Sequence, residues 1–531
     1  MVVCAEPALA APKVDVAIRG GTIYTGAEAP PMTGDVEIAG DRIVYVGPAR
    51  GTPAARTIEA RGKIVAPGFI DPHTHPDSYI RSDDPKRRLN LPWLAQGVST
   101  IVIGADGNGT PDVAADARRL EASGIGTNVA PLVGFGAIRT RVLGTVDRAP
   151  DAAELEREKA LAATAMCQGA YGLSTGLFYA PQSYAKTDEV IAVAREAGRR
   201  GGLYDTHQRD ESNYTIGLLG SVREAIAIGR AAGMPVHFAH LKALGVDLHG
   251  QAPAVIAEIE RARAAGQDVT ADQYPWLASG TSLDAALVPN WALAGGYQAM
   301  VARFAEPKTL DRIRAEMREN LRRRGGAASL LLTSAGQPWT GKTLAQMGGS
   351  WNLDPVDAAI RILRVPNAEG TRAAGIAVAS FNMVDRDVDL IMKQPWVVTA
   401  SDGSDGHPRQ YATFPRKYQV YVRERRVIPI GDFIRRSTGL TADIYGIAGR
   451  GYLRPGYYAD VVVFDPVRYA PRADYVRPRE PSVGVDALFV NGRLALANGA
   501  VSGVAAGRAL LRSSPAHCAA STPPQFQTGP R

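Results

Sequence analysis

The stretch VAPGFIDPHTHPD, residues 65–77, decides how this chain of 531 residues is interpreted. Its apolar run ends at Asp71 and is followed by two histidines separated by one residue, His73 and His75. Side chains alternate along an extended strand, so residues two apart share a face. His73 and His75 therefore point the same way from the end of a buried strand, as ligands of a divalent transition metal do. An isolated HxH motif is weak evidence, so the rest of the chain has to support it.

The overall composition is that of an ordinary globular protein, 45% hydrophobic and 21% charged, with a formal net charge of +7. Basic clusters at residues 86–88, 322–324 and 423–426 lack interleaved aromatics, so we interpret them as solvated helix faces and expect no nucleic-acid partner. No apolar run reaches about 18 residues, so we expect no membrane span. Three cysteines predict no disulfide framework.

The middle of the chain, residues 63–447, alternates apolar strands with helices rich in Ala, Arg and Glu. The candidate strands are residues 63–71, 99–104, 126–134, 169–175, 202–207, 235–240, 268–273 and 396–401. Eight buried strands alternating with helices predict an α/β fold, a (β/α)8 TIM-like barrel. The last two strands are about 120 residues apart, far more than one crossover needs. We therefore expect an insertion between strands 7 and 8, at about residues 276–350.

The two ends of the chain have a different pattern. Residues 13–62 and 448–512 read as short alternating strands with turns, and predict one small β-sandwich built from both chain ends. Residues 513–531 are polar and Pro-rich, and predict a disordered tail. The start, MVVCAEPALAAP, contains a stretch that resembles a signal cleavage site but has no basic region before it. We favour export, periplasmic or secreted, over a cytoplasmic location, with a floppy N-terminus as the alternative.

Scarce residue types collect at the predicted strand ends. Four of the eight histidines lie there, and Asp402 follows the eighth strand. In a barrel of this kind the chemistry sits at the carboxyl ends of the strands, which meet at one rim. The predicted metal ligands are therefore His73, His75, His207, His240 and Asp402. We assign His237 to packing, and give no metal role to His249, His407 or His517.

This set of residues predicts hydrolysis. A Zn²⁺ ion held by neutral imidazoles lowers the pKa of a bound water from about 15.7 toward about 7 and polarises a carbonyl. A carboxylate beside the ion, Asp402, can take the water's proton and return it to a leaving amine. We therefore predict Asp402 as the catalytic general base and acid.

Several motifs together resemble one family. They are GKIVAPGFIDPHTHPD, GLSTGLFYAPQSYA, YDTHQRDES, HFAHLK, DQYPW, VVTASDG, HPRQYATFPR and LRPGYYADVVVFDP. The chain resembles the amidohydrolase superfamily and, within it, the N-acyl-D-amino-acid deacylase (D-aminoacylase) branch. The resemblance implies a barrel flanked by a small β-sandwich, with one or two Zn²⁺ ions in the mouth. It also implies that Arg409 takes the substrate's α-carboxylate and that Lys242 and Tyr274 contact the substrate.

One position departs from the branch. A cysteine usually follows the second strand there as a metal ligand, whereas this chain has GADG with Asp106 at the matching place. The lysine or glutamate that other relatives supply from the fourth strand is missing from GAYGLSTGL. We predict Asp106 as a ligand that could bridge two metals, a turn residue being the alternative. Metal count stays open.

The sequence thus predicts a metal-dependent amidohydrolase that cleaves the linear amide bond of N-acyl amino acids, of D configuration by resemblance. One alternative is a cyclic-amide hydrolase of the hydantoinase or dihydroorotase type. Another is a barrel that binds a metal or ligand without turning it over. The expected partner is a small-molecule substrate. The sequence does not decide whether the protein forms a homo-oligomer, which acyl group it accepts or which amino-acid side chain it prefers.

Overall fold

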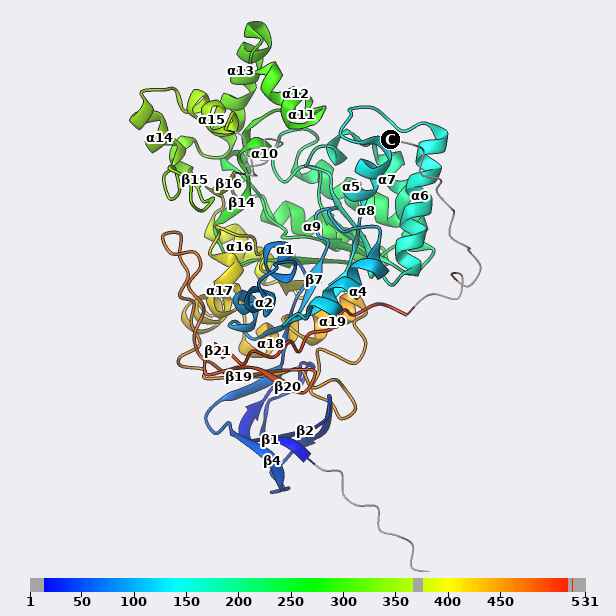
Figure 1. The fold of residues 1–531 in the computed structure, drawn as a ribbon, viewed down its shortest axis with the longest axis vertical. Helices are drawn as coiled ribbons and strands as arrows, with labels where there is room; N and C mark the ends of the chain where they lie inside the picture. The colour runs from blue at the N-terminus through cyan, green and yellow to red at the C-terminus, as the bar shows by residue number, and fades with distance from the viewer. Residues whose placement is uncertain (1–13, 366–375, 514–517, 519–531) are drawn as a thin grey trace, which may run out of the picture.

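The computed structural model describes residues 14–365, 376–513 and 518, and shows three parts stacked along the long axis (Figure 1). A β-domain lies at one end, the barrel in the middle, and a mainly helical insertion at the other end. The N-terminal stretch on which the expectation of export rests, His517 and most of the predicted disordered tail lie outside the described residues. No helix of the described part is long and apolar enough to cross a membrane.

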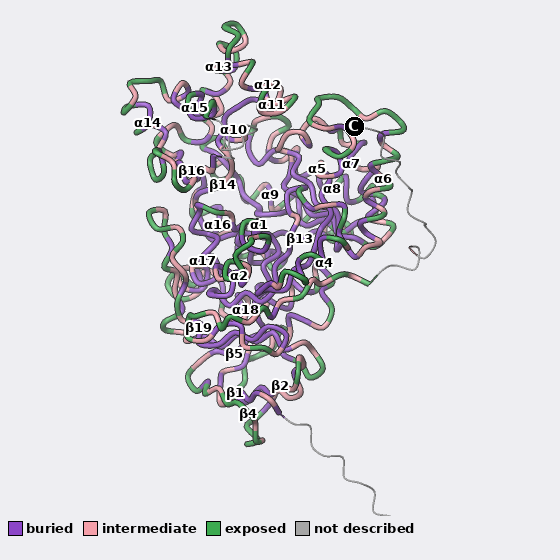
Figure 2. Tube along the Cα trace, in the orientation of Figure 1, coloured by how far each residue is buried: buried purple, intermediate pink, exposed green. Residues whose placement is uncertain are grey.

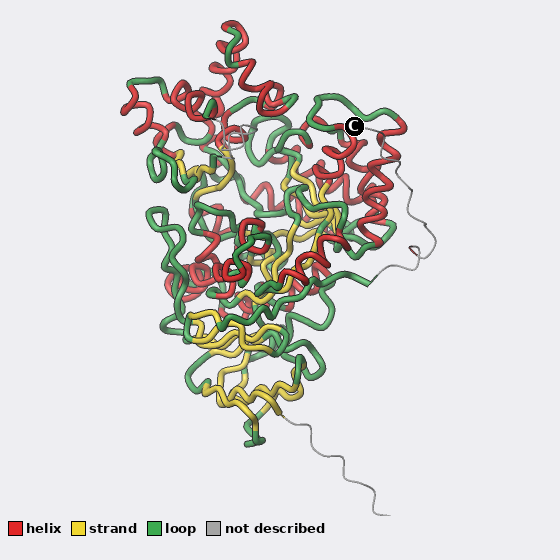
Figure 3. Tube along the Cα trace, viewed as in Figure 1, coloured by secondary structure: helices red, strands yellow, loops and turns green. Residues whose placement is uncertain are grey.

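The predicted (β/α)8 barrel is confirmed. Its parallel strands are β6 (Phe69–Asp71), β7 (Val98–Ile103), β8 (Asn128–Pro131), β9 (Val133–Gly134), β10 (Gly172–Gly176), β11 (Leu203–His207), β12 (Val236–Phe238), β13 (Val269–Gln273) and β17 (Val397–Thr399). They follow one another in chain order around the barrel, with β8 and β9 separated only by Leu132. A parallel bridge from Thr74 to Gly403 joins the first strand to the last. Figure 3 shows these strands as the yellow centre of the molecule.

Helices cover the outside of the barrel. They include α4 (Val113–Ser123), α5 (Phe135–Leu143), α6 (Ala152–Cys167), α7 (Thr187–Gly198), α8 (Leu218–Ala232), α9 (Ala252–Ala264), α16 (Asp385–Met392), α18 (Ile430–Arg436) and α19 (Gly439–Tyr445). Helix α6 shows why they begin where they do: Asp151 accepts from the Glu154 amide, and Glu154 accepts from the Asp151 amide, both at 2.8 Å. Such a capping box satisfies two free amide groups of the first turn.

The segment predicted as a first barrel strand, residues 63–71, is in fact two strands. Strand β5 (Ile64–Pro67) pairs with β18 (Val461–Phe464) in the β-domain, and β6 begins the barrel. The chain changes sheet at Gly68, whose amide donates to the Asp460 carbonyl at 2.9 Å. A Cβ at Gly68 would lie 2.4 Å from Ser99 Oγ. The prediction of one strand was wrong because Pro67 and Gly68 mark a switch between sheets within one apolar run.

Both chain ends build the β-domain. Nine strands form one sheet: β1 (Val14–Ile23), β2 (Met32–Ala39), β3 (Arg42–Gly47), β4 (Ala54–Glu59), β5, β18, β19 (Val485–Val490), β20 (Arg493–Ala497) and β21 (Ala500–Val501). The sheet curls back on itself, because the Ile43 and Ala459 amides bond the 457 and 41 carbonyls across it. Its inner face buries an apolar cluster drawn from both ends of the chain, seen as purple trace in Figure 2.

The insertion runs from β14 (Ala278–Ser282) to β16 (Ala377–Phe381), because β16 returns to pair antiparallel with β14. It also holds β15 (Leu330–Leu332), α10 (Leu283–Leu287), α11 (Asn290–Leu293), α12 (Gly296–Arg303), α13 (Pro307–Arg323), α14 (Leu344–Trp351) and α15 (Pro355–Leu363). These elements share their own apolar core. The prediction that residues 322–324 form a solvated helix face was wrong for Arg324, which is only 2% exposed.

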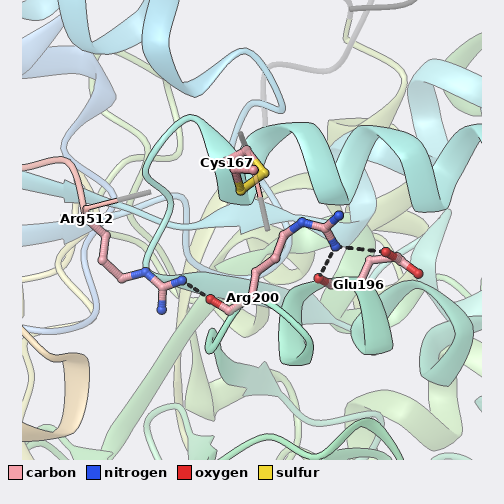
Figure 4. Close-up of a disulfide and its surroundings, with 5 residues drawn as sticks. Cys167, Glu196, Arg200 and Arg512 are labelled. Carbon is pink, nitrogen blue, oxygen red and sulfur yellow. Dashed lines mark hydrogen bonds and ion pairs between the residues drawn. A yellow bond between two sulfur atoms is a disulfide. The ribbon is translucent and has the colours of Figure 1, made fainter. Parts of the chain in front are cut away.

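The three cysteines predicted no disulfide framework, but the structure contains one disulfide, between Cys167 and Cys518. Figure 4 shows the bridge at the end of α6. Residues 508–512 lie along the side of the barrel: the Val129 amide donates to the Arg508 carbonyl and the Arg512 amide donates to the Gly169 carbonyl, both at 2.9 Å. Arg512 also donates to the Arg200 carbonyl. Nothing in the sequence connects two cysteines 351 residues apart.

We expect the bridge to stabilise the fold. Replacing Cys518→Ser should lower the free energy of unfolding by about 2 kcal/mol or more, since the cross-link restricts a long loop in the unfolded chain. Chemical denaturation with and without dithiothreitol measures this. The reductant should destabilise the native protein and leave the variant unchanged; an equal response of both would contradict a stabilising role.

Candidate metal centre and active site

The ends of the first and last barrel strands are hydrogen-bonded to each other. The Asp402 amide donates to the His73 carbonyl at 3.0 Å, and the His75 amide donates to the Gly403 carbonyl at 2.9 Å. This pairing brings a residue that follows β17 against two histidines that follow β6. His207 is the last residue of β11, and His240 lies two residues beyond β12. All the predicted strand-end ligands therefore reach one rim.

Three of the predicted metal ligands have a left-handed backbone conformation. The φ angles are 54° at Asp106, 36° at His240 and 47° at Asp402. Such conformations cost energy for residues other than glycine and persist where the surroundings fix them. Asp106 is held by its neighbours: its carbonyl accepts from Gln182 Nε2 at 2.8 Å, and the Gly107 amide donates to Ser174 Oγ at 3.1 Å. The turn therefore presents the Asp106 carboxylate to the barrel mouth.

The Asp106 carboxylate lies among four imidazoles. Its Oδ1 is 3.3 Å from His73 Nε2 and 3.6 Å from His240 Nε2. The same atom is 3.7 Å from His207 Nδ1, and Oδ2 is 3.4 Å from His75 Nε2. Asp402 approaches from the other side, with Oδ1 3.3 Å from His75 Nε2 and 3.8 Å from His73 Nε2. The structure thus brings all six predicted metal ligands together.

This cluster fits a divalent metal on several independent grounds. Three groups of ligand atoms each lie within 4.8 Å of one another: His73, His240 and Asp402; His73, His75 and Asp106; Asp106, His207 and His240. Both ring nitrogens of His73, and Oδ1 of Asp106, are buried without a hydrogen-bond partner. Buried polar atoms normally have a partner, so such orphans are suited to coordination. Two groups share Asp106, which places its carboxylate between two triads.

The charges of the cluster favour a bound cation. Burial lowers the pKa of His75, but Asp106 and Asp402 outweigh it and raise that pKa to about 10. Burial would raise the pKa of Asp106, yet the imidazoles around it hold that pKa well below its ordinary value. His207 differs, because burial lowers its pKa to about 4 and leaves a neutral ring. The carboxylates therefore draw positive charge into this space, which a metal ion can supply.

The predicted substrate residues lie beside the cluster. Arg409 is buried at the start of α17 (Arg409–Arg416), and its Nη1 is 2.7 Å from Asp402 Oδ2. The ring of Tyr274 lies 5.0 Å from the Arg409 guanidinium carbon and 5.5 Å from Lys242 Nζ. The Tyr274 hydroxyl is buried without a partner, and burial raises its pKa well above the usual value, so it remains a donor. Two cations and a hydroxyl thus converge near Asp402.

The three substrate residues and the predicted metal ligands other than His73 line one cavity of about 1110 Å³. Barrel loops form one wall, and the insertion supplies Tyr297, Met300 and Arg324 to the other. The cavity is large enough for an amino acid with an acyl group, since ligand sites typically span about 300–1,000 Å³.

Comparisons with known proteins agree with this geometry. The Amidohydrolase family model matches residues 342–495. An N-acyl-D-aspartate deacylase of Alcaligenes xylosoxydans xylosoxydans is 34% identical over 510 residues, 91% of this chain and 92% of that protein. The chain belongs to the amidohydrolase family. A structure described as showing the binuclear metal center of D-aminoacylase aligns with a TM-score of 0.79 and 30% identity, over 94% of this chain and all of that one.

A second solved relative of this amidohydrolase is an N-acyl-D-glutamate deacylase from Bordetella bronchiseptica, complexed with zinc and a phosphonate mimic of the tetrahedral intermediate. It aligns with a TM-score of 0.78 at 30% identity, covering 94% of this chain and all of that one. Both alignments cover 94% of this chain and so include the barrel, the β-domain and the insertion. The similarity to the family is therefore not confined to the motifs.

Glu211 also belongs to this site, although it was not among the residues predicted from the sequence. This buried carboxylate bonds Lys242 Nζ at 2.5 Å and lies 3.1 Å from His240 Nδ1. Lys242 Nζ is itself 2.8 Å from His240 Nδ1, so the three groups form a compact unit. Glu211 follows His207 by four residues in HQRDE, and that proximity was the available signal.

The other histidines that the structure describes lie outside the metal cluster. His407 is buried, and its Nδ1 accepts from the Arg409 amide at 3.1 Å, which fixes the start of α17. His237 bonds Thr270 Oγ1 at 2.8 Å and Asp272 Oδ2 at 3.1 Å, and Asp272 Oδ1 accepts from the His240 amide at 2.7 Å. His237 thus supports the loop that carries His240. His249 contacts the Asn382 carbonyl at 3.3 Å.

We expect zinc to stabilise chelator-treated protein. At a free zinc concentration 100 times Kd, the gain in unfolding free energy should be about 2.7 kcal/mol. Asp106→Asn should remove most of that gain, because it takes a charged oxygen from the centre of the cluster. Asp112→Asn, which changes an exposed carboxylate nearby, is the matched control. Thermal unfolding and metal analysis measure both; equal zinc binding by the two variants would exclude Asp106 as a ligand.

Proposed function

We propose that this protein hydrolyses the amide bond of N-acyl-D-amino acids. The observation that carries the proposal is the placement of a carboxylate-binding group against the metal cluster in one cavity. Arg409, Lys242 and Tyr274 offer donors suited to the α-carboxylate of an amino acid. The D configuration is supported by the relatives, which are named for N-acyl-D-amino acids.

The proposed metal ligands are His73, His75, Asp106, His207, His240 and Asp402, holding one or two zinc ions. Zinc bound there would supply Lewis acidity, which activates a water and polarises the amide carbonyl. The solved relatives support this choice, since one is described with a binuclear center and the other with zinc. Asp106 contributes a carboxylate to both of the triads that it joins.

Arg409 and Asp402 would have different roles in the reaction. Arg409 would bind the α-carboxylate while its Nη1 keeps Asp402 oriented at 2.7 Å. Asp402, whose pKa the Arg409 charge and the imidazoles hold below its ordinary value against the effect of burial, stays ionised and can accept a proton. It would later return that proton to the departing amine, because an amine anion leaves poorly.

Glu211 acts on this site through its neighbours. A ring that coordinates a metal through Nε2 carries its proton on Nδ1, and a carboxylate at that position fixes the ring orientation. Glu211 lies 3.1 Å from His240 Nδ1, whereas His240 Nε2 faces the cluster. We infer that Glu211 orients His240 and balances the charge of Lys242.

The alternatives receive less support. A cyclic-amide substrate offers no free α-carboxylate to Arg409, and the two deacylase relatives that match more than nine-tenths of the chain are named for N-acyl-D-aspartate and N-acyl-D-glutamate, which are linear compounds. A barrel that only binds metal would not need a carboxylate clamp beside Asp402. We also infer export to an oxidising compartment, since disulfides such as Cys167–Cys518 persist there. Cell fractionation tests this, and a cytoplasmic protein with free thiols would contradict it.

Asp402→Asn should lower kcat for N-acetyl-D-leucine by about 10²- to 10⁴-fold, because it removes a proton acceptor and donor. Asp405→Asn is the matched control, since Asp405 lines the same cavity but pairs with Arg479 at 2.8 Å. Steady-state kinetics with D and L enantiomers measure both rates. Activity that survives Asp402→Asn would refute the mechanism, and a preference for the L enantiomer would refute the stereochemistry.

Arg409→Ala should have two separable effects. KM should rise about tenfold or more for N-acetyl-D-leucine and change little for N-acetyl-D-leucinamide, which has no carboxylate to bind. The kcat should fall for both substrates, because the Arg409–Asp402 ion pair is lost in each case. Parallel kinetics on the two compounds separate the effects; an equal rise of KM for both would place the α-carboxylate elsewhere.

A further inference from the structure

Arg324 lies in an unusual place for a charged residue. It follows α13 directly and is 2% exposed, yet it lines the cavity. Its Nε donates to the Ala286 carbonyl at 3.0 Å and its Nη1 to Ser380 Oγ at 3.2 Å. No carboxylate of the described residues lies within 4.0 Å of the guanidinium, and its Nη2 makes no hydrogen bond with them. Burying a cation without an anion is costly.

Tyr214 places a second unsatisfied donor beside this guanidinium. Its ring lies 5.7 Å from the Arg324 guanidinium carbon, and its hydroxyl is buried without a hydrogen-bond partner. Burial raises the pKa of Tyr214, so the hydroxyl keeps its proton. The acids nearby are engaged elsewhere: Asp210 accepts three backbone amides of its own loop, and Glu211 bonds Lys242.

Both residues stand close to the proposed reaction centre. Phe178 contacts both Tyr214 and His207, with ring-centroid distances of 5.6 and 5.8 Å. Ser380, which receives the Arg324 bond, pairs across the strands with Ser279. The next residue, Gly280, accepts from Arg409 Nη2 at 3.5 Å. The β14–β16 strand pair therefore accepts hydrogen bonds from Arg409 and Arg324 at neighbouring positions.

We propose that Arg324 and Tyr214 form a second anion subsite, which binds a second carboxylate of the substrate. The inference rests on the proposed function, in which Arg409 takes the α-carboxylate. The second carboxylate belongs either to an acidic D-amino-acid side chain or to a dicarboxylic acyl group. A neutral group of the same shape would leave the guanidinium unpaired, so the subsite selects by charge.

The native enzyme tests the subsite with substrates of matched shape. N-acetyl-D-glutamate is compared with N-acetyl-D-glutamine, and N-succinyl-D-leucine with its primary amide, N-succinamoyl-D-leucine. We expect kcat/KM to favour the dicarboxylate by about 10- to 100-fold in one pair. A preference within the glutamate–glutamine pair assigns the second carboxylate to the amino-acid side chain. A preference within the two N-acyl-D-leucine compounds assigns it to the acyl group. No preference in either pair overturns the subsite, whereas hydrolysis of none of the four compounds overturns the proposed function itself.

Single-residue variants test whether Arg324 and Tyr214 cause the preference for dicarboxylate substrates. Arg324→Gln should abolish it by lowering kcat/KM for the dicarboxylate alone, and Tyr214→Phe should weaken it in the same direction. Arg318→Gln, on the exposed face of α13, is the matched control and should preserve it. Circular dichroism and zinc content show that each variant is folded. A preference that survives Arg324→Gln, or losses equal for charged and neutral substrates, would refute the assignment; Arg324→Lys repeats the test if the glutamine variant does not fold.

Discussion

The electrostatic cost of burying carboxylates is the constraint on which this structure depends. Asp106, Asp402 and Glu211 are all buried at the barrel mouth, where unpaired charges are expensive. Each has positive partners: imidazoles surround Asp106, Arg409 pairs with Asp402, and Lys242 pairs with Glu211. The cations that compensate these acids are the groups suited to binding metal and substrate. The same ion pairs therefore stabilise the protein without metal and position the groups that act when metal and substrate are bound.

Closure of the barrel brings the buried carboxylates and their partners together in one site. The residues after β6 and β17 are hydrogen-bonded to each other, so Asp402 meets His73 and His75 without help from flexible loops. The same first strand begins only after Gly68 has carried the chain out of the β-domain. The β-domain thus fixes where the first ligand pair enters the barrel, which gives the distant domain a structural part in building the site.

The sequence predicted those parts of the molecule in which scarce residue types coincide with regular spacing. Histidines at strand ends are rare enough that His207 and His240 stood out against their surroundings. Glu211 did not, because acidic residues are common in loops and its partner Lys242 is 31 positions away. Arg324 was misread as solvated, since three consecutive arginines at a helix end usually face water. Only the packing of the insertion against the barrel shows that the third one points inward.

A division of labour follows from these differences. The reacting groups sit on strand ends, which are rigid and whose geometry follows from the barrel. Arg324 comes instead from the insertion, which has a core of its own and joins the barrel through β14 and β16. A change of side chain there alters the cavity wall without disturbing the cluster around Asp106. Selection among N-acyl compounds can therefore vary through the insertion, while the barrel keeps the hydrolytic geometry constant.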